Sequence, residues 1–302
     1  MPTEESVVLV DGPWRHREVT ANGARFHVAE TGPADGPLVL LLHGFPEFWW
    51  SWRHQLLALG AAGYRAVAPD LRGYGASDKP PRGYDQYTLS SDVAGMVRAL
   101  GARDAVLVGH DWGGALAWAV ATLHPRVVRR LAVLAMPHPL RLAAALRRDP
   151  AQLRASAYIG FFQLPKAPEA RLLRHDGAYV GELLARWGGP GFPDRETEAR
   201  CRTAVQVPAV AHCALEWYRW AVRSLTRPSG LRFQRLLGQG VSAPVLQMHG
   251  ALDRCLLPTT AQGSGAWAHG GHALQVIDGI GHFPHEEAPD LVSAALLAHA
   301  RT

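Results

Sequence analysis

Apolar residues along the chain form short runs, continuous or alternating, and longer stretches with the spacing of an amphipathic helix lie between them. Predicted strands lie at residues 15–20, 24–30, 38–42, 64–68, 106–108, 130–135, 245–248 and 273–277. Predicted helices lie at 51–62, 89–100 and 115–120, with a closing helix from Leu291. Asn22-Gly23 predicts a hairpin between the first two strands. The later alternation of strands and helices predicts an α/β fold with a mostly parallel, doubly wound sheet.

The alternation stops after Met136-Pro137-His138-Pro139 and resumes near residue 241. Between these points the spacing predicts only helices, at 140–147, 170–174, 178–187 and 210–225. We therefore expect a sheet domain made of residues 1–137 and 241–302, interrupted by an all-helical cap at 138–240. Such a cap is expected over the carboxyl ends of the strands, where open α/β sheets bind their ligands.

The composition is that of an ordinary globular protein, with 302 residues, 48% of them hydrophobic and 19% charged. The net charge of +5 comes largely from arginines that are scattered along the chain, so we expect no nucleic-acid partner. Cys201, Cys213 and Cys255 form no C-x-x-C pair and are expected to be reduced thiols. Neither a signal pattern nor an apolar run of about 20 residues is present. These features predict a cytoplasmic monomer or homodimer that does not enter membranes.

Residues 106–114 join a predicted strand to a predicted helix through a very tight turn. Gly109, Gly113 and Gly114 allow a close approach that forces the Asp111 side chain out at the tip, as in a nucleophile elbow. A carboxylate is ionised near pH 7 and needs no base to attack an sp3 carbon, which leaves an ester on the enzyme. From this stretch alone, a chance turn with a helix-capping aspartate stays open.

Two later loops, each after a predicted strand, supply an acid and a histidine. Asp253 follows the strand at 245–248, and His282 follows the strand at 273–277 through a glycine-rich loop. With Asp111 these give the order nucleophile, acid, histidine that α/β hydrolases use. His282 is predicted to take a proton from water, and Asp253 to hold its tautomer. The chain holds 15 histidines, so an ordinary surface histidine is the alternative; packing or loop hydrogen bonding is predicted for His110, His249 and His285.

Hydrolysis of such an ester requires donors for the oxyanion. The expected donors are the backbone amides of Trp112, which follows the nucleophile, and of Phe45, which follows the strand at 38–42. Pro46 stiffens the second loop and cannot compete as a donor. A simple turn at residues 43–46 is the alternative.

Together these motifs resemble the α/β-hydrolase-fold epoxide hydrolases. The resemblance runs from about Trp14 to the C-terminus and is weakest in the middle of the cap. It rests on His43-Gly44-Phe45-Pro46-Glu47, Trp50-Ser51-Trp52-Arg53, Asp70-Leu71-Arg72-Gly73-Tyr74-Gly75-Ala76-Ser77 and Gly109-His110-Asp111-Trp112-Gly113-Gly114. It implies conversion of a small apolar epoxide and water to a vicinal diol through an aspartyl ester, without metal or cofactor. It also implies a cis Phe45–Pro46 bond.

The resemblance further implies that two cap tyrosines hold the epoxide oxygen. The matching positions are Tyr158, five residues before Gln163, and Tyr218 in Trp217-Tyr218-Arg219. A phenol with a pKa near ~10 stays protonated at neutral pH and can donate to an alkoxide. Simple packing of both rings at a domain interface is the alternative. Trp112, Phe161 and Phe162 suggest an apolar, aryl-tolerant pocket.

Two families that use the same nucleophile fit the motifs less well. Haloalkane dehalogenases typically place Asn after His-Gly, where this chain has Phe45. Fluoroacetate dehalogenases typically place Arg after the nucleophile, where this chain has Trp112. A non-catalytic binding protein of the same fold would not need the nucleophile, acid, base and tyrosine pair. The sequence therefore favours an epoxide hydrolase.

Overall fold

The computed structural model describes residues 4–301, and its centre is an eight-stranded sheet in the order β1-β2-β4-β3-β5-β6-β7-β8. The strands are β1 Arg15–Ala21, β2 Ala24–Thr31, β3 Leu38–Leu42, β4 Arg65–Pro69, β5 Ala105–His110, β6 Val128–Leu134, β7 Val245–Gly250 and β8 His272–Ile277. β2 pairs antiparallel with β1 and with β4, and every other pair is parallel. The predicted mostly parallel α/β sheet is confirmed.

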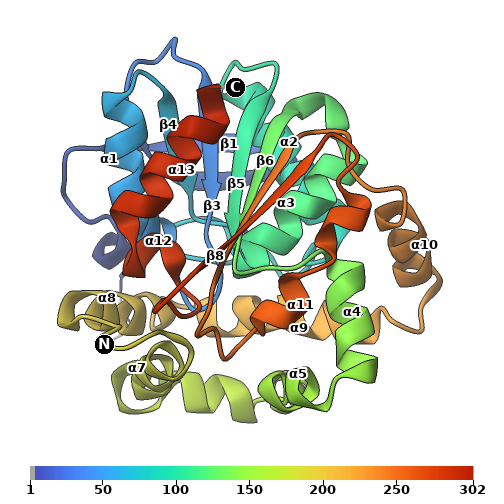
Figure 1. The fold of residues 1–302 in the computed structure, drawn as a ribbon. Helices are drawn as coiled ribbons and strands as arrows, with labels where there is room; N and C mark the ends of the chain where they lie inside the picture. The colour runs from blue at the N-terminus through green and yellow to red at the C-terminus, as the bar shows by residue number, and fades with distance from the viewer. Residues whose placement is uncertain (1–3, 302) are drawn as a thin grey trace.

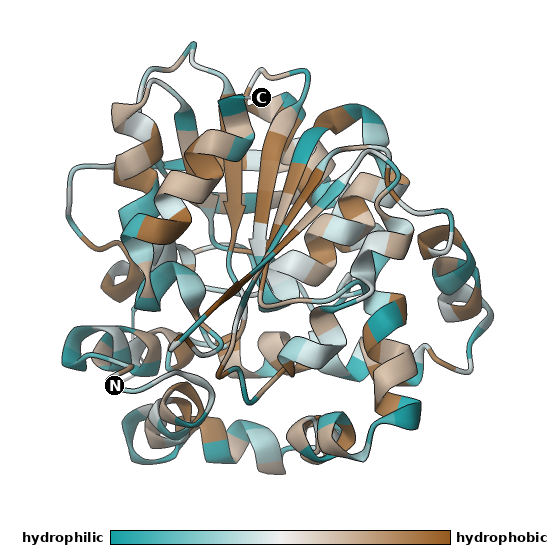
Figure 2. Ribbon diagram, viewed as in Figure 1, coloured by the Kyte–Doolittle hydropathy of each residue, from teal (hydrophilic) through white to brown (hydrophobic). Residues whose placement is uncertain are grey.

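Helices cover both faces of this sheet (Figure 1). α1 Arg53–Ala61 packs with α13 Pro289–Arg301, and α2 Gln86–Ala99 packs with α3 Asp111–Leu123. Because both faces are covered, the central strands are buried throughout and stand out as hydrophobic in Figure 2. Burial of a leucine such as those in β3 stabilises the fold by roughly 1.5–3 kcal/mol relative to an exposed one.

Between β6 and β7 the described chain forms only helices, and these lie beside the sheet's lower end in Figure 1. We call α4 to α10 the cap. They are α4 Pro139–Arg148, α5 Pro150–Ala155, α6 Tyr158–Phe161, α7 Ala167–Trp187, α8 Arg195–Val205, α9 Val210–Arg223 and α10 Pro228–Leu237. α7 is broken by non-helical backbone at residues 174–177, where the sequence predicts a gap between two helices.

The sequence analysis did not predict α5, α6, α8 and α10. α8 is mostly polar and shows only a weak apolar stripe, although Asp194 caps it by accepting from the amides of Glu196 and Thr197. An aspartate ahead of two acidic first-turn residues is a helix-start signal that could have found α8. The remaining short elements are α11 Pro258–Ala261, α12 Pro284–Glu287 and the 3-10 helices Glu5–Val8, Trp49–Trp52, Pro125–Val127 and Ser264–Trp267. No helix within residues 4–301 combines the length and apolarity needed to cross a bilayer.

Candidate active site

Asp111 stands at the junction of β5 and α3, where strand passes into helix without a loop. Its backbone has a φ of 49°, in the left-handed region that non-glycine residues seldom adopt. A Cβ on Gly109 would lie 2.2 Å from the carbonyl oxygen of Gly113, and a Cβ on Gly113 would lie 2.2 Å from that of Leu42. Only glycine permits this approach, so the turn holds the Asp111 side chain in one place.

The carboxylate of Asp111 meets the loop that follows β3. The amide of Phe45 donates to Asp111 Oδ1 over 3.0 Å, and the Phe45–Pro46 peptide is cis, as expected. The amide of Trp112 belongs to the first turn of α3, where backbone N–H groups have no partner inside the helix. The Phe45 amide thus contacts the Asp111 carboxylate, and the Trp112 amide lies in the helical turn that begins at Asp111.

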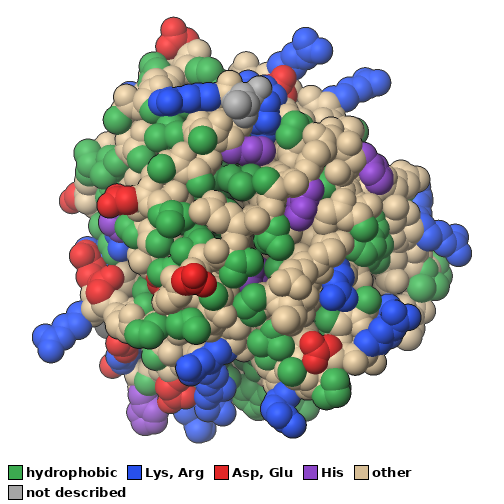
Figure 3. Space-filling view, in the orientation of Figure 1, with side chains coloured by type: hydrophobic (Ala, Val, Ile, Leu, Met, Phe, Trp, Pro, Cys, Tyr) green, Lys and Arg blue, Asp and Glu red, His purple; other side chains and the backbone are tan. Residues whose placement is uncertain are grey.

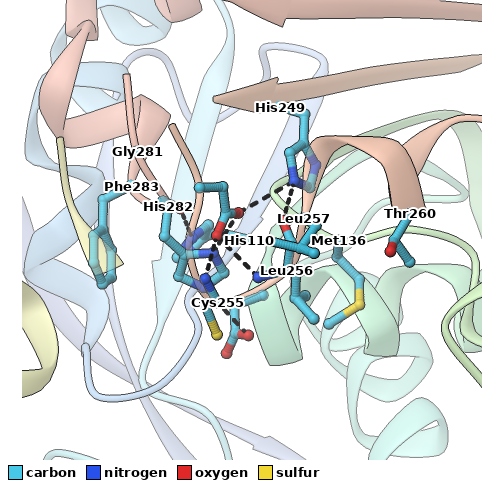
Figure 4. A network of polar contacts seen from close by, with 12 residues as sticks. His110, Met136, His249, Cys255, Leu256, Leu257, Thr260, Gly281, His282 and Phe283 are labelled. Carbon is cyan, nitrogen blue, oxygen red and sulfur yellow. Dashed lines mark hydrogen bonds and ion pairs between the residues drawn. The ribbon is translucent and has the colours of Figure 1, made fainter. Parts of the chain in front are cut away.

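His282 and Asp253 form a buried pair next to this carboxylate, and Figure 4 shows His282 within the surrounding network of polar contacts. His282 Nδ1 donates to Asp253 Oδ2 over 2.8 Å, while the amides of Cys255 and Leu256 donate to Asp253 Oδ1 over 2.8 and 2.9 Å. His249 Nε2 lies 3.2 Å from Asp253 Oδ2. Four groups thus fix the orientation of one carboxylate, which in turn fixes the orientation of the His282 ring.

This arrangement leaves the other ring nitrogen of His282 facing the Asp111 carboxylate. His282 Nε2 lies 3.5 Å from Asp111 Oδ2 and makes no hydrogen bond within the described part of the chain. Burial acts to lower the pKa of His282, but the charge of Asp253 and contact with Asp111 raise it well above its usual value. Burial acts to raise the pKa of Asp253, and the contacts with His282 and His249 bring it below its usual range. The raised pKa of His282 therefore comes mainly from the charge of Asp253, and the contact with Asp111 adds to it.

Two cap tyrosines complete the site above Asp111. Tyr158, which begins α6, and Tyr218 of α9 line the same cavity as Asp111 and Trp112, with a volume of about 220 Å³. Their ring centroids are 5.9 Å apart, and the Tyr218 ring also meets Trp112 edge-on at 4.8 Å. Burial raises the pKa of both phenols well above the usual value, so both hydroxyls are protonated donors.

Comparison with known proteins agrees with this geometry. A model of the alpha/beta hydrolase fold family matches residues 37–289. The AB hydrolase superfamily protein YfhM of Bacillus subtilis is 35% identical over 94% of this chain and 96% of its own length. Epoxide hydrolase A of Mycobacterium tuberculosis is 34% identical over 93% of this chain and 95% of its own. The crystal structure of Epoxide Hydrolase A from Mycobacterium thermoresistibile superposes with a TM-score of 0.82 at 30% identity, covering 95% of this chain and 98% of that one.

The chain belongs to the epoxide hydrolases of the α/β-hydrolase fold. Outside the candidate catalytic residues, this epoxide hydrolase has a buried set of Glu47, His110 and His285 close to His282. His110 Nδ1 lies 2.7 Å from Glu47 Oε2, and His110 Nε2 donates to the backbone carbonyl of His282 over 2.7 Å. His285 Nε2 lies 3.2 Å from Glu47 Oε1.

This set has the donor types and spacing of a metal site, with one ligand atom from each residue inside 4.8 Å. However, both ring nitrogens of His110 already have short hydrogen bonds to oxygen. His110 instead joins Glu47 to the backbone carbonyl of His282. Histidine neighbours of the motifs were predicted to pack or to hold loops, and the distances for His110 agree with that role.

The cavity differs from the predicted pocket in two residues. Its lining, within residues 4–301, contains Ile159 but neither Phe161 nor Phe162, which corrects the sequence prediction. Phe162 is fully buried and packs against the two cavity tyrosines without lining the cavity itself. Its ring centroid lies 5.4 Å from that of Tyr158 and 5.0 Å from that of Tyr218. α6 is a single turn, so Tyr158 and Ile159 at its start face the cavity while its end turns into the cap core.

Cys255 contributes to the site in a way that the sequence only hinted at. Its thiol lies 3.4 Å from the hydroxyl of Tyr158, and its backbone amide donates to Asp253 Oδ1. Burial raises the pKa of this thiol, so it is a neutral neighbour. It can therefore hold the Tyr158 hydroxyl in place without adding a charge.

Proposed function

We propose that the protein converts apolar epoxides to vicinal diols through an ester on Asp111. The observation that carries this proposal is a single cavity that holds Asp111, Tyr158 and Tyr218 together, with the His282–Asp253 pair behind the carboxylate. The remainder of the lining is mainly leucine, alanine, valine and aromatic side chains from α4, α9 and α10. Such a lining favours uncharged substrates, because a charged group would lose its hydration there.

In the first step, an oxygen of Asp111 attacks a ring carbon and the C–O bond of the epoxide breaks. The developing alkoxide takes a proton from Tyr158 or Tyr218, which gives a hydroxy ester and a tyrosinate. Protonated phenols suit this step because they donate most strongly as negative charge appears on the oxygen. Trp112 packs against the Tyr218 ring and holds it over the carboxylate.

In the second step, His282 takes a proton from water, and the hydroxide formed attacks the ester carbonyl of Asp111. The amides of Phe45 and Trp112 stabilise the oxyanion. Once esterified, Asp111 no longer offers the carboxylate contact that contributes to the raised pKa of His282, which favours the neutral imidazole that acts as the base. Collapse of the tetrahedral intermediate breaks the ester C–O bond, and the leaving alkoxide takes the proton of the new carboxylic acid to give the diol. The proton on His282 then passes to the tyrosinate.

A single turnover of styrene oxide in heavy-oxygen water tests the proposal. With enzyme in excess, the first diol takes its new oxygen from Asp111, and one heavy oxygen remains on that carboxylate. Mass spectrometry of the peptide that contains residue 111 measures the label. Label in the diol with none on Asp111 would show direct attack by water, and halide release from a chloroalkane without turnover of styrene oxide would identify a dehalogenase.

Removal of either cavity hydroxyl is expected to slow ring opening. Tyr158→Phe and Tyr218→Phe each remove one donor to the alkoxide, for a loss of about 10–100-fold, since a hydrogen bond to a charged group contributes roughly 1.5–3 kcal/mol. The double variant should lose more than either single variant. Stopped-flow fluorescence during single turnovers measures the step. Tyr179→Phe is the matched control, since Tyr179 is a buried cap tyrosine outside the cavity lining; equal losses in all variants would show a packing role only.

We also infer a cytoplasmic location. The three cysteines are free and buried, which suits a reducing compartment. On the face drawn in Figure 3, basic side chains are spread around the molecule rather than gathered in one patch. Epoxide and water are the proposed small-molecule partners, and assembly as a monomer or homodimer stays a prediction.

A further inference from the structure

A second hollow lies outside the catalytic cavity, where the loop before α2 faces the cap. Its volume is about 430 Å³. One wall comes from residues 81–87, and the other from α9 and the start of α10. Figure 1 shows α9 along the lower part of the molecule and α10 at its right edge. We call it the α9 cleft; it is lined by Pro81, Arg82, Gly83, Tyr84, Asp85, Tyr87, Glu216, Trp220, Arg223, Arg227 and Ser229.

Three arginines in the α9 cleft have free guanidinium groups. Arg82, Arg223 and Arg227 are exposed. Across residues 4–301 the structure gives none of their guanidinium groups a hydrogen bond or an ion pair. Arginines from two separate segments, one in the core and two in the cap, thus face one small space without neutralising partners.

The two carboxylates in the cleft are engaged elsewhere. Asp85 caps α2, where its side chain accepts from the amides of Tyr87 and Thr88 and from the Thr88 hydroxyl. Glu216 pairs with Arg219 at 3.1 Å. The free hydrogen-bonding capacity of the cleft is therefore mostly cationic, and guanidinium forks match carboxylate and phosphate oxygens in geometry.

Aromatic rings form the inner side of the same cleft. Trp220 and Tyr87 both pack edge-on against Phe233, with centroids 5.8 and 5.7 Å away. The Tyr87 hydroxyl donates to the carbonyl of Ser229 over 3.1 Å, which joins the core loop to the start of α10. Both rings are half-buried, so each keeps some surface available for a flat apolar group.

We propose that the α9 cleft binds a small aromatic anion, a planar ring that carries a phosphate, sulfate or carboxylate group. The ring packs on Trp220 and Tyr87, and the anionic group pairs with Arg82, Arg223 and Arg227. The catalytic cavity does not suit this ligand, because Asp111 repels an anion and the rest of that lining is largely apolar. Trp220 lies in both linings and separates the two sites.

Calorimetric titration with phenyl phosphate tests the proposal, with inorganic phosphate and phenol as the two partial ligands. We expect phenyl phosphate to bind more tightly than either, and its affinity to fall as salt rises. The triple variant Arg82→Gln, Arg223→Gln, Arg227→Gln should weaken binding by about tenfold or more, since charge-assisted pairs are lost. Arg147→Gln with Arg148→Gln, an exposed arginine pair at the end of α4, is the matched control and should bind normally.

A second variant separates the ring from the charge. Trp220→Leu should weaken phenyl phosphate while leaving inorganic phosphate unchanged. The proposal is overturned if phenyl phosphate does not bind, if the triple variant binds it as well as the native protein, or if inorganic phosphate binds equally well. Purely competitive inhibition of epoxide turnover that persists in the triple variant would place phenyl phosphate in the catalytic cavity and would also overturn it. The calorimetric outcomes do not depend on the proposed reaction, so they can fail or succeed separately from it.

Discussion

Replacing Asp111 with asparagine is expected to lower the turnover of styrene oxide by about 10⁴-fold or more, as removal of a nucleophile does in other hydrolases. The amide is neutral and a poor nucleophile, so the first bond to carbon does not form. The change is nearly isosteric, and the Phe45 amide can still donate to the side-chain oxygen, so the fold should be kept. Steady-state diol formation and the thermal midpoint of unfolding measure the two effects.

The matched control is Asp104→Asn, which removes a carboxylate at the start of β5, where it pairs with Arg129 at 3.3 Å on the surface. This variant should retain full activity. Slow deamidation can restore aspartate at position 111, so intact mass must be read at each time point. Substantial activity while the amide at 111 is intact would contradict the nucleophile assignment.

The nucleophile turn was predictable because its cause is local. Gly109 and Gly113 are required by contacts between atoms that are close along the chain or on the adjacent strand β3. The parallel strands were predictable for a similar reason, since burial on both faces demands continuous apolar runs. Parallel strands also bring their carboxyl ends to one edge, and this is why Asp253 and His282, distant in sequence from Asp111, could be placed beside it.

The cap lining was less predictable because it depends on how short helices rotate. Phe162 follows Tyr158 by four residues, and a regular helix places such residues on one face. In the structure Tyr158 lines the cavity while Phe162 lies behind it, in contact with Tyr218. Packing against the surrounding helices decides which side chains of a one-turn helix face the cavity. The local sequence pattern does not contain this information.

The support under His282 also depends on contacts between distant segments. Glu47 and His110 are 63 residues apart, and His110 and His282 are 172 apart. In the sequence, each of these residues is only a polar residue near the end of a predicted buried strand. That position indicates that the side chain is buried but does not identify the residue it contacts. Burial acts to raise the pKa of Glu47, and the two histidines hold it well below its usual value. A carboxylate kept ionised there can anchor His110, and through it the His282 backbone.

Replacing His282 with glutamine is expected to stop the reaction after ring opening, because glutamine cannot take a proton from water. Ring opening needs only Asp111 and the tyrosines, so the ester should form and persist. Steady-state turnover should fall by about 10²–10⁴-fold, the usual contribution of a general base. Intact-mass spectrometry should show the protein heavier by one substrate, and the modified peptide should contain residue 111.

The control for this variant is His175→Gln, which changes an exposed histidine at the break in α7 and should leave turnover unchanged without an adduct. Asp253→Asn provides a graded comparison, because it keeps the imidazole but removes the charge that raises its pKa. That variant should accumulate less ester than His282→Gln. Two results for a folded His282→Gln protein would contradict these roles: turnover at the native rate, or no gain of the substrate's mass. Either result would show that the carboxylate does not open the ring, or that the imidazole is not needed to release the product.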